Sequence, residues 1–311
     1  MTAQCNRRSM LRYLLASSAV AAAPTLSRSV WASEGSKKGQ LRLVFYSDVH
    51  ARTEWGTPEA LAAAADAINA RNADLVIGCG DLITDGFQSS AETVAPRWDA
   101  YMKMHDSLNG EVHAAIGNHD LVAAIPEDGS EPSDDPRSVF RQRLRVTRTY
   151  YSFDALGYHV VLLDSIQILG NISKYQGLID REQMEWIRED LSKISKTTPI
   201  IVALHIPLLT GFFQATEGAT AAAPAGRVVV NNVDVLDLFK EHNLVLVLQG
   251  HLHITEMLRW QNTTFITGGA LSGKWWRGSW LGTSEGFNLV TLRGDRIEWE
   301  YLTYGWKSRR P

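Results

Sequence analysis

Gly117-Asn118-His119-Asp120 is a polar turn that directly follows the apolar run Val112 to Ile116. Four other apolar runs also lead to aspartate or histidine: residues 41–46 lead to Asp48 and His50, 75–79 to Asp81, 200–204 to His205, and 244–248 to His251 and His253. Buried strands of α/β sheets are short apolar runs, and the sites of such sheets lie beyond the carboxyl ends of the strands. The pattern therefore predicts five strands that deliver polar side chains to one edge.

The segments between these runs favour helices. Thr57-Pro58-Glu59 offers an N-cap, a proline at the first helical position and an acidic first turn. Asp180-Arg181-Glu182-Gln183 is typical of a capping box, and a third helix is expected over residues 233–242. Helices that alternate with strands indicate an α/β fold.

The pattern changes after His253. Strand-like segments cover residues 255–260, 264–267, 287–292 and 296–301, and Gly294-Asp295 marks a tight turn between the last two. We expect these segments to form an antiparallel meander, which makes the sheet system mixed.

The polar residues at the strand ends are of kinds that bind metal ions. Carboxylate and imidazole groups without thiolates favour Fe, Mn, Zn or Mg. Residues two apart on an extended segment point to the same side, so Asp48 with His50, and His251 with His253, could each reach one ion. Asp81 has two carboxylate oxygens and could bridge two cations.

In this order, Asp-x-His, Gly-Asp, Gly-Asn-His-Asp, His and Gly-His-x-His resemble the motifs of the calcineurin-like metallophosphoesterase superfamily over residues 41–253. The resemblance implies an α/β fold of mixed α+β character, a four-layer sandwich of two mixed β-sheets flanked by helices. It also implies a strand pair formed by residues 150–153 and 160–164, with a structural role for Asp164.

The same resemblance implies two metal ions, Fe, Mn or Zn. One would be held by Asp48, His50, Asp81 and His253, and the other by Asp81, Asn118, His205 and His251. A hydroxide that bridges the two metals would attack phosphorus in line with the leaving alkoxide.

His119 is not needed as a ligand. The equivalent histidine of family members meets the leaving-group side of the substrate, so we expect His119 to act as a general acid or to contact phosphate; the alternative is a structural histidine behind the ligands. Asp85 is its candidate acidic partner, although the best-known phosphatase branch has aspartate one position earlier, where this chain has Thr84. Asp120 could serve instead, or it could bind backbone donors.

Purple acid phosphatases, a sister branch, have tyrosine three residues after the bridging aspartate. Thr84 at that position, together with His50, predicts a colourless or weakly coloured protein without a tyrosinate–iron charge-transfer band.

Two stretches are expected to select the substrate. Residues 121–148 form a long segment that could act as a lid. Residues 268–278 contain Lys274, Trp275, Trp276 and Arg277. A tryptophan could stack on a nucleobase or another flat leaving group, and Lys274 or Arg277 could pair with phosphate. The alternative is packing tryptophans and solvated charges.

Residues 1–32 resemble a twin-arginine export signal. Arg7-Arg8 precedes the apolar run 13–23, which is too short to cross a bilayer of about 30 Å. We expect cleavage after Ala32, passage through the twin-arginine translocation machinery, and a bacterial periplasmic or secreted domain, residues 33–311, without a transmembrane anchor. The alternative is a basic tail.

Other residues match no motif. Cys79 is expected to be a small buried apolar residue, and His105, His113, His159 and His242 to be structural. A formal net charge of −3 with mixed signs argues against a specific nucleic-acid surface.

Together these features predict an exported dinuclear-metal phosphoesterase that acts on small phosphomonoesters or phosphodiesters. A nucleotide or cyclic-nucleotide phosphodiesterase is favoured, followed by a broad phosphomonoesterase. A non-catalytic metal- or phosphate-binding protein of the same fold is the alternative from another class. Metallo-β-lactamase-type hydrolases have a compact His-x-His-x-Asp-His run, which this chain lacks.

Overall fold

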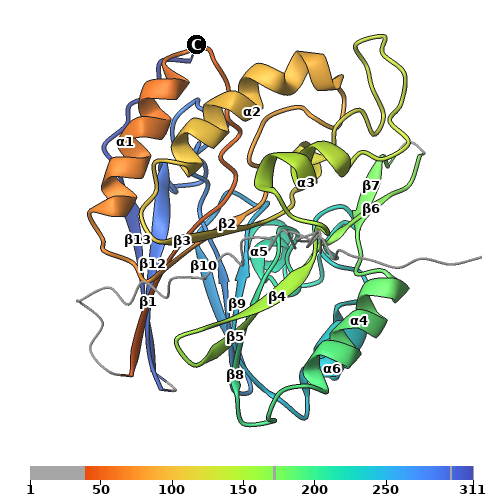
Figure 1. Cartoon of the computed structure of the whole chain (residues 1–311), viewed down its shortest axis with the longest axis vertical. Coiled ribbons are helices and arrows are strands. Elements are labelled where there is room, and N and C mark those ends of the chain that lie inside the picture. The colour runs from red at the N-terminus through yellow and green to blue at the C-terminus, as the bar shows by residue number, and fades with distance from the viewer. Residues whose placement is uncertain (1–38, 171–172, 295, 311) are drawn as a thin grey trace, which may run out of the picture. The chain divides into compact units, whose positions relative to one another are not determined.

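The computed structural model describes residues 39–170, 173–294 and 296–310, so the predicted export signal lies outside the described residues. Within them, the chain forms two large β-sheets (Figure 1). The first has the strand order β13-β12-β1-β2-β3, and the second β10-β11-β9-β8-β5-β4.

The strands of the first sheet are β1 (Gln40–Tyr46), β2 (Leu75–Cys79), β3 (Glu111–Ala115), β12 (Gly286–Arg293) and β13 (Arg296–Thr303). Those of the second are β4 (Tyr151–Ala155), β5 (Tyr158–Leu162), β8 (Pro199–Ala203), β9 (Asn243–Gln249), β10 (Glu256–Trp260) and β11 (Thr263–Thr267). A small hairpin joins β6 (Ile166–Ile168) to β7 (Tyr175–Gly177). The predicted pairing of residues 150–153 with 160–164 is confirmed by antiparallel β4 and β5.

Alternation along the strands divides the core into two buried clusters. Leu43 of β1 and Ile77 of β2 pack in one cluster with Leu162 and Ile201 of the second sheet. The intervening residues, such as Val44, belong to the other cluster, which contains the helices. Because both faces of these strands are buried, their sequences are apolar throughout.

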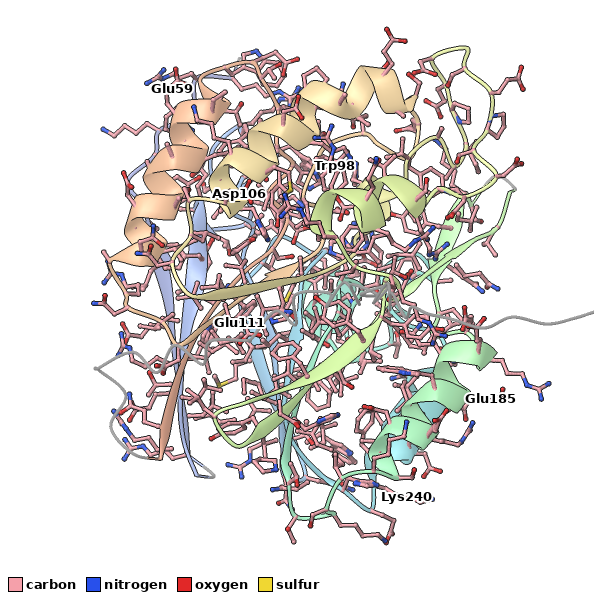
Figure 2. The ribbon with its side chains drawn as sticks, in the orientation of Figure 1. Glu59, Trp98, Asp106, Glu111, Glu185 and Lys240 are labelled. Atoms are coloured by element: carbon pink, nitrogen blue, oxygen red, sulfur yellow. The ribbon has the colours of Figure 1, made fainter. Side chains whose placement is uncertain are left out.

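The helices form the outer layers. Figure 1 shows α1 (Thr57–Asn69) and α2 (Ala91–His105) beside the first sheet, and α4 (Arg181–Leu191) and α6 (Asn232–Phe239) beside the second. Shorter helices are α3 (Ser138–Leu144), α5 (Phe212–Glu217) and the 3-10 turn η1 (Asn118–Asp120). Trp98 of α2 is fully buried, whereas Glu185 of α4 is exposed; both are labelled beside their helices in Figure 2. The predicted four-layer sandwich is confirmed.

The expected C-terminal meander is wrong. β10 and β11 form a hairpin on the second sheet, where β11 pairs in parallel with β9, whereas β12 and β13 form a hairpin on the first, where β12 pairs antiparallel with β1. Alternation predicts each hairpin but does not identify its neighbouring strand. The connection, residues 268–285, therefore passes from one sheet to the other.

Two helix starts differ in detail from the predictions. Gly56, with a φ of 72°, is the N-cap of α1 in place of Thr57, whose hydroxyl donates to the Glu54 carbonyl. At α4, Asp180 accepts from the Gln183 amide, but the Gln183 side chain bonds the backbone of Asp164. The predicted capping box is thus half formed, because the second partner is used in a tertiary contact.

Candidate metal centre

The loops that follow β1, β2, β3, β8 and β9 bring the predicted ligands together. These strands run parallel within each sheet, so their carboxyl ends lie at the same edge. Each predicted ligand is buried, with an exposed fraction of at most 4 %: Asp48, His50, Asp81, Asn118, His205, His251 and His253. Polar side chains this deeply buried require partners.

Four of them converge as the first predicted ligand group. Nε2 of His253 lies 3.2 Å from Oδ1 of Asp48 and 3.1 Å from Nε2 of His50. The same nitrogen of His50 lies 3.7 Å from Oδ2 of Asp81. One ion could contact all four side chains.

The second predicted group shares an oxygen with the first. Oδ2 of Asp81 lies 3.2 Å from Nε2 of His205, and this nitrogen lies 3.2 Å from Oδ1 of Asn118 and 3.1 Å from Nδ1 of His251. Asp81 therefore stands between the two groups, where its carboxylate could bridge two cations.

Main-chain carbonyls fix the protonation of three histidines. Nδ1 of His205 donates to the Cys79 carbonyl at 2.8 Å, and Nδ1 of His253 to the Gly273 carbonyl at 2.6 Å. Nε2 of His251 donates to the carbonyl of Gly226 at 2.9 Å. In a neutral imidazole the opposite nitrogen then has no proton, and in each ring that nitrogen points into the cluster.

These inward lone pairs fit metal ions. Oδ1 of Asp48 is buried and accepts no hydrogen bond from the described residues, although Nε2 of His253 lies close to it. Lone pairs that face one another at about 3 Å repel unless a cation lies between them. The set of nitrogen and oxygen donors, without sulfur, suits Fe, Mn or Zn.

Electrostatics keep most of these ligands ready for a cation. Burial opposes ionisation of Asp48 and Asp81, but neighbouring histidines outweigh it and lower both carboxyl pKa values below their usual range. Burial, followed by the charge of His205, lowers the pKa of His251 to about 3. Burial opposes protonation of His205, yet Asp81 raises its pKa to about 9, so in the metal-free protein this ring keeps a proton on the Asp81 side that a bound cation would displace.

The segments that carry the ligands are not extended. The prediction that alternation along an extended segment brings Asp48 with His50, and His251 with His253, to the same side is therefore wrong. The φ angles of Asp48, His50, Asp81, His251 and His253 are 54°, 45°, 52°, 72° and 57°. Such left-handed conformations cost about 1–3 kcal/mol each in residues other than glycine and need support from their surroundings. Oδ2 of Asp48 provides some, because it accepts from the His251 amide at 2.9 Å and the Ser47 hydroxyl at 2.6 Å.

Gly117 begins the loop after β3 and packs closely against the loop after β2. A Cβ atom added to Gly117 would lie 2.0 Å from the amide nitrogen of Asp81. The main-chain N–H of His119 donates to Oδ1 of Asp81 at 2.8 Å. Only glycine lets the turn lie this close to the shared carboxylate.

The His119 ring is hydrogen-bonded to the main chain of Asp85 and not to the carboxylate of Asp85, which was the expected partner. Nδ1 of His119 accepts from the main-chain N–H of Asp85 at 2.9 Å, whereas the nearest carboxylate oxygen of Asp85 is 3.9 Å away. That carboxylate instead pairs with Arg52 at 3.0 Å. In the neutral ring the proton is therefore on Nε2 of His119, which can donate a hydrogen bond.

Asp120 binds backbone donors, which was the second of the two roles predicted for it. Its carboxylate accepts from the amides of Gly117, Leu82 and Ile83 at 2.8, 2.8 and 3.1 Å, and it is fully buried. It ties the turn of β3 to the turn of β2, and its hydrogen bonds within the described part of the chain go to these amides rather than to the His119 ring.

The two predicted tryptophans of the substrate stretch differ. The half-buried Trp275 has its ring centre 4.4 Å from that of His253. Trp276 is 1 % exposed and donates from Nε1 to the His50 carbonyl at 2.9 Å, so it has no face open for stacking and supports the ligand loop instead. Both residues have left-handed backbone conformations, with φ values of 48° and 69°.

The charged neighbours of these tryptophans are exposed. Nζ of Lys274 lies 4.9 Å from the centre of the Trp280 ring, and Arg277 lies on the surface. Part of the expected lid is anchored, because α3 inserts the fully buried Phe140 beside Trp98.

Sequence reasoning missed several residues that hold the site. The carbonyls of Cys79, Gly226 and Gly273 have no side-chain signal, because every residue has a carbonyl. Arg52, two positions after His50, has a charge that could have identified it as a neighbour of the site.

Comparisons with known proteins agree with this geometry. The family model described as "Calcineurin-like phosphoesterase" matches residues 41–255. "Purple acid phosphatase 22" of Arabidopsis thaliana is 26 % identical over 215 residues, which are 67 % of this chain and 43 % of that protein. The chain thus spans less than half the length of this relative.

Solved structures share the fold. A dimetal phosphatase from Danio rerio has a TM-score of 0.59 at 15 % identity, over 85 % of this chain and 96 % of that one. Purple acid phosphatase PPD1 from yellow lupin has a TM-score of 0.56 at 17 % identity, over 86 % and 52 %.

Proposed function

The chain belongs to the calcineurin-like phosphoesterase family, and on that basis we propose that it is a dinuclear-metal hydrolase of phosphomonoesters or phosphodiesters. The observation that carries the proposal is the sharing of one oxygen, Oδ2 of Asp81, by two groups of buried donors. We assign Asp48, His50 and His253 with Asp81 to one metal. The other metal is assigned to Asn118, His205 and His251 with Asp81.

The residues of this chain hold and orient the reactants. When bound, the two cations supply Lewis acidity and a water that ionises near neutral pH. Nε2 of His119 donates to a phosphoryl or leaving-group oxygen, because the Asp85 amide occupies Nδ1. The ring of His119 meets that of His50 edge to face at 4.8 Å, which places the donor beside the ligands.

Two observations bear on the class of substrate, and they favour different candidates. Trp275 beside His253 offers a partly open aromatic face, which favours a nucleotide or cyclic nucleotide as substrate. The purple acid phosphatases among the relatives favour a broader phosphomonoesterase. Direct comparison of monoesters with diesters decides between them.

Metal analysis paired with an activity panel tests the proposal. The protein is loaded with Fe, Mn or Zn and assayed with p-nitrophenyl phosphate and bis(p-nitrophenyl) phosphate, before and after chelation. We expect about two metal ions per chain and activity that is lost on chelation and restored by metal. Asn118→Ala and His119→Ala should each lower hydrolysis; if neither does, the measured hydrolysis does not take place at this site and the proposal is wrong.

We also propose export through the twin-arginine route to the periplasm or outside the cell. Arg7-Arg8, the apolar run 13–23 and Val30-Trp31-Ala32 support it. None of the described helices is long and apolar enough to cross a membrane. A reporter fused to residues 1–40 should be exported in a bacterium with this pathway, and Arg7→Lys with Arg8→Lys should stop export.

A further inference from the structure

Four arginines gather beside His119 and Trp275. We call them the arginine cluster: Arg52, Arg97, Arg277 and Arg310. Nη2 of Arg52 donates to Oδ2 of Asp85 at 3.0 Å and to the Thr84 hydroxyl at 3.1 Å. Nη1 of Arg97 donates to the Thr84 carbonyl at 2.8 Å and lies 3.8 Å from the same Asp85 oxygen.

Trp55 contacts two arginines of the cluster, and the main chain of Trp275 contacts one of them. The guanidinium of Arg310 lies 4.1 Å from the centre of the Trp55 ring, and that of Arg52 lies 4.8 Å from it. Nη1 of Arg310 also donates to the Trp275 carbonyl at 2.8 Å. The cluster is thus connected to both Trp275, beside His253, and Asp85, beside His119.

The cluster carries more positive charge than its acidic neighbours neutralise. Burial, followed by the charges of Arg52 and Arg277, lowers the pKa of Arg310, while Asp85 and Glu54 oppose the shift. Among the described side chains in these contacts, four arginines against Asp85 and Glu54 leave two positive charges in excess. Like charges held this close favour an additional anion.

We propose that the arginine cluster binds a second anionic group of the substrate, a phosphate carried by the leaving group. The inference rests on the proposed function, because it places the scissile phosphoryl group at the metal ligands and the leaving group toward His119. Arginine suits this task, since its planar guanidinium binds phosphate oxygens in pairs. Arg310, which lies over Trp55, and Arg97, which donates to the Thr84 carbonyl, are both partly exposed.

A matched pair of probes tests it. Adenosine 5′-monophosphate and adenosine 3′,5′-bisphosphate differ by one phosphate, and both can be measured as competitors of p-nitrophenyl phosphate whether or not they are hydrolysed. Tryptophan fluorescence titration gives their dissociation constants independently of turnover. We expect the metal-loaded protein to bind the bisphosphate at least about tenfold more tightly, as hydrogen bonds to charged groups typically allow.

Variants then locate the effect. Arg310→Gln and Arg97→Gln should each reduce the preference for the bisphosphate several-fold, and added salt should reduce it in the wild type. Arg310→Lys, which keeps the charge, should retain part of the preference. Arg181→Gln, on the exposed face of α4, is the control and should retain all of it.

Two outcomes overturn the inference: equal binding of the two probes by the wild type, or an equal loss for both probes in Arg310→Gln and Arg97→Gln. Failure of the proposed function is distinct. It appears as absent hydrolysis of p-nitrophenyl phosphate and bis(p-nitrophenyl) phosphate by the metal-loaded wild type, while the fluorescence titration still reports the preference.

Discussion

The main-chain N–H of Asp85 donates to Nδ1 of His119 at 2.9 Å, and the carboxylate of Asp85 turns toward Arg52. The backbone therefore orients the catalytic candidate, whichever side chain residue 85 carries. Substitutions of the Asp85 side chain and of His119 should therefore affect catalysis differently.

Asp85→Asn should lower kcat for p-nitrophenyl phosphate much less than His119→Ala does. The asparagine keeps the main-chain hydrogen bond, whereas alanine removes a donor of the kind that contributes about 100-fold or more to catalysis. Steady-state kinetics on the metal-loaded variants measure both. Equal losses would instead assign the carboxylate of Asp85 the role of acidic partner.

Gly117→Ala should damage the metal centre and the fold together. The added Cβ would lie 2.0 Å from the amide nitrogen of Asp81, and overpacking of this kind costs about 1–3 kcal/mol. Thermal unfolding and metal content should both decrease. Gly211→Ala, where the nearest atom is 3.5 Å away, should leave both close to wild type; an unchanged Gly117→Ala protein would contradict the geometry.

His159 should make stability depend on pH. Burial opposes its protonation, but hydrogen bonds to Asp190 at 2.9 Å and Asp154 at 2.7 Å raise its pKa above the ordinary 6.5. A raised folded-state pKa contributes stability that is complete below 6.5 and lost as pH rises through the folded value.

Unfolding temperatures measured across this range test that sign. His159→Gln should reduce the dependence, and His105→Gln, whose partner is the adjacent Asp106, should retain it. A wild-type protein that gains stability from this histidine with rising pH would refute the assignment.

The iron-loaded protein should lack a strong visible charge-transfer band. Thr84 stands where the purple branch has tyrosine, and its buried hydroxyl accepts from Arg52. Tyr175 has its ring centre 6.3 Å from that of His251, and in the metal-free protein burial raises its pKa to about 12. Absorption spectra test this; a purple protein that Tyr175→Phe bleaches would identify that residue as the ligand.

The five strands and the gathering of seven polar residues could be predicted because both depend on side chains. Apolar runs specify buried strands, and the residues that follow them specify donors. Trp275 and Trp276 show the limit, since adjacent identical residues differ in exposure, and the partner that buries Trp276 is the main-chain carbonyl of His50, which is distant in the sequence. The C-terminal hairpins show another, because each pattern fits an edge of either sheet.

The three histidines held by the carbonyls of Cys79, Gly226 and Gly273 have one more consequence. Because main-chain carbonyls orient these rings, the binding of a metal ion needs little rearrangement of the protein. Exchange of one transition metal for another should then proceed on a folded scaffold, with the cell's supply of each element influencing which one is installed.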